Sequence, residues 1–136
     1  MTRTPDRFLD SNVLLYLASS DTRKAAIAET LLQGGGVISV QVLNEIANVA
    51  RRKMGLSWPE LADFLGAVRG LLRVENLTVA THERGLALAE RYGLSLYDAM
   101  IAAAALEAGC ELLLSEDMQH GMDLGGIRVE NPFAAS

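Results

Sequence analysis

Cysteine and long apolar runs are almost missing from this 136-residue chain, and each shortage excludes a class of protein. The one cysteine, Cys110, cannot form a disulfide within the chain, and we expect its thiol to be buried as an apolar group near a helix end. No apolar stretch approaches the roughly 20 residues that cross a bilayer. The first residues, 1–6, lack the apolar core of a signal peptide. We therefore expect a cytoplasmic protein with no membrane segment.

Basic charge is also scarce, since 12 Lys and Arg stand against 17 Asp and Glu, for a net charge of −5. This balance counts against a broad nucleic-acid-binding surface, although cations held by carboxylates would cancel part of it locally. Phosphate-binding glycine loops are missing too, because the triplet 34–36 matches neither GxGxxG nor GxxxxGK[ST]. The length suits one domain, residues 1–136, with a core that needs no disulfide.

Short apolar segments alternate with helix-length segments along the chain. This pattern predicts a three-layer α/β/α domain whose central, mainly parallel sheet has about five strands. The expected strands are 7–9, 37–39, 73–78, 112–114 and 127–130. The expected helices begin near residues 11, 21, 40, 57, 81 and 95. We expect Ser57 and Glu60 to form a capping box, and Thr81 to cap the fifth helix.

Four acidic side chains occupy apolar surroundings, where a soluble protein rarely places charge. Asp10 and Asp117 each follow an apolar strand, whereas Glu45 and Asp98 lie in apolar helical segments. Ligands of parallel sheets bind beyond the carboxyl ends of the strands, so one crevice could collect all four carboxylates. Like charges about 4 Å apart repel by roughly 4 kcal/mol at an effective dielectric of 20. An oxygen-only set suits Mg²⁺ or Mn²⁺, which predicts metal-dependent phosphoryl transfer or phosphodiester hydrolysis.

Each of these carboxylates also has a purely structural interpretation. Asp10 could cap the following helix, and Asp98 stands at the last position of a capping box. Glu45 could point to solvent from the edge of its apolar stripe. Asp117 could lie in a solvated turn, in which Glu116 is expected to face solvent. The prediction of a site therefore depends on the four acids occurring together.

Each of the four acids lies in a short sequence motif of its own. These segments are FLDSNVLLY (8–16), VLNE (42–45), LYDAMIA (96–102) and LSEDMQHG (114–121), and a fifth segment, IRVENPF (127–133), follows them. Together they resemble the motifs of the PIN-domain nucleases, in particular the VapC-type toxins of toxin–antitoxin pairs, over the whole chain. Ser11 and Ser115 stand where that family often has Thr, which keeps the hydroxyl.

The resemblance implies a metal-dependent endoribonuclease, the toxin of a type II toxin–antitoxin system, with Mg²⁺ or Mn²⁺ as cofactor. Its catalytic and metal-binding residues would be Asp10, Glu45, Asp98 and Asp117. Asn12 and Ser115 would orient those ligands by hydrogen bonds. The substrate would be RNA, and the products would carry 3′-hydroxyl and 5′-phosphate ends.

The resemblance also implies two protein partners, a cognate antitoxin and a second copy of the chain. A pocket of carboxylates attracts a guanidinium, so an antitoxin arginine would suit it. A homodimer would need an exposed apolar face. Leu61, Phe64 and Leu65 could supply one, although they could equally belong to the core.

Two other functions fit part of the pattern. A receiver or haloacid-dehalogenase-like phosphotransfer domain also places Asp after its first strand. However, position 12 is Asn, so the DxD pair is missing, and the only lysines, Lys24 and Lys53, lie too early for a receiver. A non-catalytic binding module with the nuclease fold would be favoured by loss of an acid, and none is lost.

Basic and aromatic side chains near the motifs have alternative roles. Arg51, Arg52 and Lys53 lie in the last turn of a helix, where they offset the helix dipole or contact an RNA backbone. Trp58 and Tyr97 could stack on bases, but we expect them to pack in the core.

Overall fold

The computed structural model describes residues 7–134, and its centre is one sheet of five parallel strands in the order β3-β2-β1-β4-β5. The segment 1–6, where we looked for a signal peptide, lies outside the described residues. The strands are β1 (Arg7–Leu9), β2 (Val37–Ser39), β3 (Arg73–Glu75), β4 (Leu112–Leu114) and β5 (Arg128–Glu130). All four pairings are parallel, so the predicted parallel sheet is confirmed.

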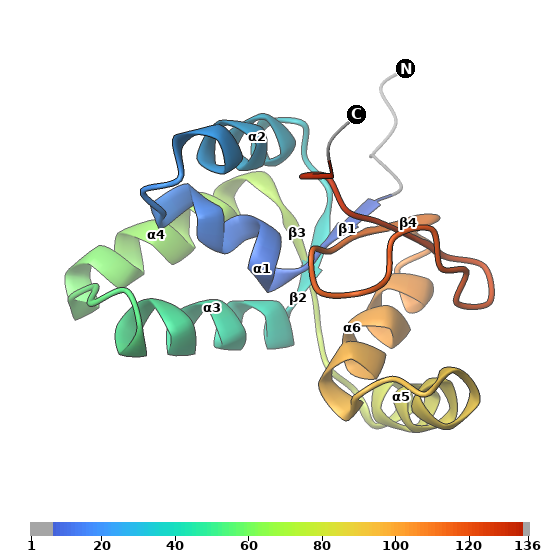
Figure 1. Ribbon diagram of the computed structural model, residues 1–136. Coiled ribbons are helices and arrows are strands. Elements are labelled where there is room, and N and C mark those ends of the chain that lie inside the picture. The colour runs from blue at the N-terminus through green and yellow to red at the C-terminus, as the bar shows by residue number, and fades with distance from the viewer. Residues whose placement is uncertain (1–6, 135–136) are drawn as a thin grey trace, which may run out of the picture.

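Helices cover both faces of the sheet, which confirms the predicted three-layer arrangement. They are α1 (Ser11–Leu14), the 3₁₀ helix η1 (Leu15–Ala18), α2 (Thr22–Gln33), α3 (Val40–Arg52), α4 (Trp58–Leu71), α5 (Val79–Tyr92) and α6 (Leu96–Glu107). Helices α1 to α4 lie on one side of the sheet, and α5 and α6 lie on the other (Figure 1). Helix α6 is apolar around its whole circumference, and it is the helix whose residues 99–105 are all buried.

The element boundaries depart from prediction at three places. The single helix expected at 11–18 is a four-residue α-helix followed by a 3₁₀ turn. Strands β3 and β5 are shorter than expected because each pairs with a neighbour of only three residues. Thr78, not Thr81, caps α5, and Thr81 instead closes the capping box from the third helical position. The Thr81 hydroxyl also donates to Glu107 Oε1 at 2.6 Å, which ties α5 to α6.

Two aromatic side chains that we expected in the core lie on the surface. Trp58 and Tyr97 are each 67% exposed, so the expectation of core packing is wrong for both. Leu61 is buried, and Phe64 and Leu65 are partly buried against the core, so this face of α4 turns inward.

The parallel strands bring the chain segments that follow them to one edge of the sheet. Asp10 N–H donates to Leu114 O at 2.9 Å, and Ser115 N–H donates to Glu130 O at 3.0 Å. Asp10, which follows β1, therefore lies beside the end of β4, and Ser115, which follows β4, lies beside the end of β5. Cys110 is buried, as predicted. Among residues 7–134, no helix has the length and apolarity that a bilayer crossing requires.

A glycine inside α4 gives a test of this helix. Gly66 is exposed, and an added Cβ there meets no atom within 4 Å. We expect Gly66→Ala to raise the free energy of unfolding by about 0.5–1 kcal/mol, because alanine loses less backbone entropy on folding. Urea denaturation measures the change.

The matched control is Gly93→Ala at the end of α5. An added Cβ is equally uncrowded there, but φ is 68°, so alanine should destabilise the fold by about 1 kcal/mol. A destabilising Gly66→Ala would show that this face of α4 is covered by something other than water.

Candidate active site

Asp10 is the most deeply buried of the four predicted carboxylates, with only 3% of its surface exposed. Its Oδ1 accepts from Ser11 N–H at 2.7 Å, which makes it the N-cap of α1. Its Oδ2 accepts from Ser115 Oγ at 2.9 Å and from Asn12 Nδ2 at 3.2 Å. The capping interpretation is therefore correct, yet it does not explain why the second oxygen has two further donors. Ser115 and Asn12 are the two residues that the family resemblance predicts to orient the ligands by hydrogen bonds.

Glu45 reaches the same edge of the sheet from α3, where it is half-buried. Ser11 Oγ donates to Glu45 Oε1 at 2.8 Å and lies 3.4 Å from Asp10 Oδ1. A hydroxyl has one proton, so the shorter contact receives it and the serine bridges two carboxylates. Gln41 Nε2 contacts Glu45 Oε2 at 3.2 Å and Tyr97 O at 3.0 Å, which ties α3 to the first turn of α6. Glu45 thus faces the cluster rather than open solvent.

Asp98 and Asp117 complete the acidic edge with greater exposure. Asp98 is half-buried in the first turn of α6, and its N–H donates to Ser95 Oγ at 3.2 Å. This bond is the half of the predicted capping box that involves the backbone of Asp98. Asp117 is exposed in the segment after β4, so the solvated-turn interpretation describes its surroundings correctly.

Electrostatic coupling joins the four carboxylates. Burial raises the pKa of Asp10 to about 7, and the charges of Glu45 and Asp98 add to the rise, against the lowering effect of hydrogen bonds from Ser115 and Ser11.

The pKa of Asp98 is also raised, first by burial and then by the charge of Asp117, while its hydrogen bond with Ser95 lowers it. Each acid therefore lies within electrostatic range of at least one other. Negative charge is therefore gathered at this edge of the sheet.

Cations of the protein do not neutralise this charge among the described residues. The ion pairs found there are Lys24–Glu116, Arg73–Glu75 and Arg128–Glu130, and none includes one of the four acids. A group of oxygen donors with several uncompensated charges fits a hard divalent cation such as Mg²⁺ or Mn²⁺. However, in residues 7–134 no three Asp, Glu, His or Cys side chains stand close enough to hold one ion together. The donor chemistry and the charge fit the metal, whereas the spacing is wider than a closed coordination shell.

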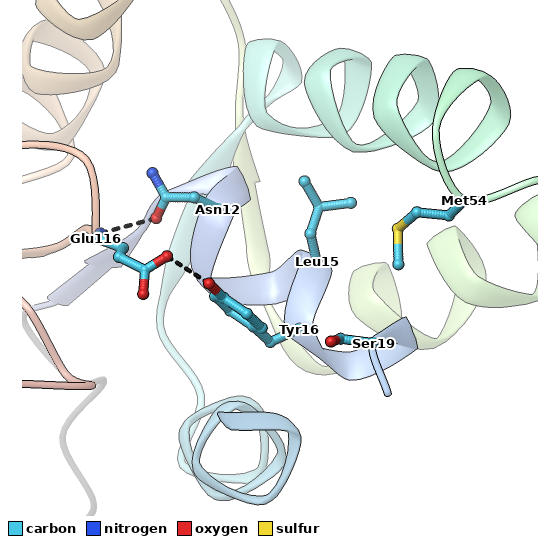
Figure 2. A pocket seen from close by; sticks show the side chains of 6 residues that line it. All are labelled: Asn12, Leu15, Tyr16, Ser19, Met54 and Glu116. Atoms are coloured by element: carbon cyan, nitrogen blue, oxygen red, sulfur yellow. Dashed lines mark hydrogen bonds between the residues drawn. The ribbon is translucent and has the colours of Figure 1, made fainter. Parts of the chain in front are cut away.

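Glu116 is directed away from the acidic cluster, which corrects the expectation that it faces solvent. Tyr16 Oη donates to Glu116 Oε1 at 2.6 Å, and Lys24 Nζ lies 2.5 Å from Glu116 Oε2. Glu116 N–H also donates to Asn12 Oδ1 at 2.9 Å (Figure 2). These contacts hold the segment between Ser115 and Asp117 against α1 and α2.

A cavity of about 270 Å³ lies beside this arrangement. Its lining residues are Asn12, Leu15, Tyr16, Ser19, Met54 and Glu116 (Figure 2).

Three contributors to the site were not predicted from sequence. Gln41 could have been found, because it stands four residues before Glu45 on one helix face. Ser11 was noted only as a hydroxyl that replaces Thr. Lys24 gives no local signal, since it lies 92 residues from its partner Glu116.

Comparisons with known proteins agree on the fold. The PIN domain family matches residues 7–120 of the chain. No curated protein matches it in sequence. A solved toxin–antitoxin complex from Klebsiella pneumoniae is 23% identical, with a TM-score of 0.72, covering 95% of this chain and 99% of that one.

Two further solved structures have the same architecture. A Mycobacterium tuberculosis VapC toxin that cleaves the sarcin–ricin loop is 21% identical, with a TM-score of 0.66, covering 82% of this chain and 91% of that one. A DNA-bound VapBC from Salmonella typhimurium is 20% identical, with a TM-score of 0.66, covering 96% and 99%. At these identities the likeness concerns the fold.

The raised pKa of Asp10 predicts how stability depends on pH in the absence of metal. Below pH of about 4 the carboxyl is protonated in the folded and the unfolded chain. Between about 4 and 7 the unfolded chain releases the proton and the folded chain retains it, so the free energy of unfolding should fall as pH rises. The slope is at most about 1.4 kcal/mol per pH unit, and it should vanish above pH of about 7.

Thermal and urea unfolding in EDTA across this range would measure the slope. Asp10→Asn should flatten it, because the amide does not titrate. Asp63→Asn on the exposed surface of α4 is the matched control and should leave the slope unchanged. An equal slope in wild type and Asp10→Asn would assign the titration to another group.

Proposed function

The chain belongs to the PIN-domain family, and from this premise we propose that it is a metal-dependent endoribonuclease and the toxin of a type II toxin–antitoxin pair. We further propose that residues 1–136 form one PIN domain. The substrate class is supported by the Mycobacterium tuberculosis neighbour, a toxin that cleaves the sarcin–ricin loop.

One observation carries the proposal. Asp10 is buried within electrostatic range of Glu45 and Asp98, and no cationic side chain among the described residues compensates them. Such an arrangement costs stability in the free protein, so it points to function rather than to folding. A purely structural cap would need one carboxylate, not a cluster.

The proposed catalytic and metal-binding residues are Asp10, Glu45, Asp98 and Asp117. When bound there, Mg²⁺ or Mn²⁺ supplies Lewis-acid activation of the phosphodiester and of the attacking water. The protein holds the carboxylates in position. Asn12 and Ser115 fix Asp10 through its Oδ2, and Ser11 and Gln41 fix both oxygens of Glu45. Such outer hydrogen bonds hold ligand carboxylates in orientation.

We expect the purified protein to cleave transfer or ribosomal RNA fragments with Mg²⁺ or Mn²⁺ and to lose this activity in EDTA. Asp98→Asn should abolish cleavage, and in EDTA it should be as stable as wild type or more stable, because it removes one of several repelling charges. If Asp98 acts only in the first turn of α6, the substitution instead lowers stability by about 0.3–1 kcal/mol and spares activity.

Activity assays and thermal melts of the same samples separate these outcomes, with Asp63→Asn as the control for carboxylate loss. Undiminished cleavage in EDTA would contradict the metal mechanism. Metal binding without cleavage of any RNA would favour a non-catalytic binding module.

We also propose two protein partners, a cognate antitoxin and a second copy of the chain. The first is supported by structural neighbours that are VapBC and toxin–antitoxin complexes. For the second, the inward-facing Leu61 makes that side of α4 a poor interface. The described residues expose a different set of large apolar side chains around α5 and the start of α6. These are Val79, Leu86 and Leu96.

Light scattering should give the mass of a dimer for the isolated chain at micromolar concentration, and Leu86→Lys should reduce it. A monomer under these conditions would contradict the dimer.

The neighbouring gene's product should inhibit cleavage through an arginine that competes with metal for the carboxylates, so inhibition should weaken as Mg²⁺ rises. Inhibition that ignores both metal and loss of that arginine would place the antitoxin elsewhere.

A further inference from the structure

The outward face of α3 carries a groove that the acidic cluster does not account for. One cavity, of about 490 Å³, is lined by Gln41, Asn44, Glu45, Asn48, Leu77 and Tyr97. A second, of about 430 Å³, is lined by Ala47, Asn48, Arg51, Arg52 and Trp58. Asn48 lines both, so the two cavities are neighbours along α3, and we call them together the α3 groove. Helix α4, whose first residue Trp58 lines the second cavity, packs beside α3 (Figure 1).

The chemistry of the α3 groove changes from one end to the other. At one end Glu45 belongs to the acidic cluster. At the other end the Arg51 guanidinium lies 4.1 Å from the centre of the Trp58 ring, and Arg51 Nη1 donates to Leu56 O at 2.7 Å, which fixes the stack. Neither Arg51 nor Arg52 forms an ion pair with a carboxylate within residues 7–134. In a chain of net charge −5, this end of the groove brings cationic charge beside an exposed aromatic ring.

We propose that the α3 groove binds a single-stranded stretch of the RNA and leads it to the acidic cluster, an inference that rests on the proposed ribonuclease function. Trp58 has 67% of its surface exposed and one face covered by Arg51, so its open face can take a base and extend the stack. Arg52 provides an unpaired guanidinium for a phosphate. The amides of Asn44 and Asn48 lie between the two ends and can bond base edges or ribose hydroxyls.

The length of the groove fixes the distance at which RNA is recognised. Glu45 and Arg52 are seven residues apart on one helix, which is about 10 Å. This equals roughly three nucleotides stacked at about 3.4 Å. Tyr97, also 67% exposed, lines the end of the groove near Glu45 and offers a second ring. A phosphate on Arg52 is therefore about three nucleotides from Glu45, and Trp58 lines the same cavity as Arg52, so both are positioning residues.

The chain contains one tryptophan, so Trp58 reports directly on its own stacking. The probe is a short single-stranded RNA of mixed sequence, added to wild type in EDTA and to Asp10→Asn with Mg²⁺, conditions in which the strand is not cut. We expect saturable quenching of Trp58 fluorescence, and little quenching by the same strand annealed to its complement.

Fluorescence anisotropy of a labelled strand then compares variants whose thermal melts match wild type. Trp58→Ala should weaken binding about 10-fold, and Trp58→Phe should recover part of the loss. Arg52→Gln should lower the slope of log affinity against log salt by about 0.7, the value for one phosphate of a single strand. Arg128→Gln, on the edge strand β5 at the opposite side of the sheet order, is the matched control and should leave the slope unchanged.

Two results of the fluorescence experiment would overturn the proposal. One is RNA binding that leaves Trp58 fluorescence unchanged in both conditions. The other is quenching by the antitoxin but not by RNA, which would assign the groove to a protein partner. The proposed function is tested separately by cleavage. Quenching without cleavage would support the groove and contradict the nuclease, whereas cleavage with equal affinities for wild type, Trp58→Ala and Arg52→Gln would do the reverse.

Discussion

A negative charge held inside the protein beside other negative charges is the constraint on which the rest of the structure depends. The β1–β4 pairing places Asp10 below the surface, and within residues 7–134 every donor to its side chain is neutral: Ser11, Asn12 and Ser115. Neutral donors orient a carboxylate and lower its pKa, but they leave the net charge in place. A buried ion pair would have removed the charge and blocked the oxygens. The neutral donors instead keep the carboxylates ordered and leave their negative charge uncompensated. Such a site suits a cation from solution, which would neutralise that charge.

The remaining charges of this region are arranged so that they do not interfere. Glu116 lies next to Asp117 in sequence, yet Tyr16 and Lys24 hold its carboxylate away from the cluster. Without this triangle a fifth acid would raise the repulsion at the sheet edge. The arginines at the end of α3 are likewise kept apart from the acids, since Arg51 is held by a backbone carbonyl and an aromatic ring. Positive and negative regions therefore coexist on one helix without neutralising each other.

Local patterns in the sequence were sufficient for much of this architecture. The short, mainly apolar segments of β1, β2 and β4 identified the buried strands, and the uncharged run 99–106 identified the buried helix α6. The four acids were predicted to share one edge because parallel strands end together, and their electrostatic coupling supports that placement. Their role as ligands stays a prediction.

The predictions that failed have one cause in common. Each concerns a feature that depends on residues distant in sequence. Thr78 and Thr81 are both good caps, and only the path from β3 decides between them. Trp58 has a large apolar side chain, but its place in the first turn of α4 leaves it outside the core. The partner of Glu116 is 92 residues away, so no local pattern could reveal it.

The order of the strands has a consequence for synthesis. Leu9 of β1 pairs with Leu114 of β4, so two of the four acids are anchored to strands separated by most of the chain. Chains emerge from the ribosome with the N-terminus first, at about 5–20 residues per second. A nascent chain that has exposed Asp10 and Glu45 still lacks β4, and the long loop closure that aligns the cluster comes last. A chain that emerges from the ribosome therefore keeps Asp10 and Glu45 apart from Asp117 until β4 has been made.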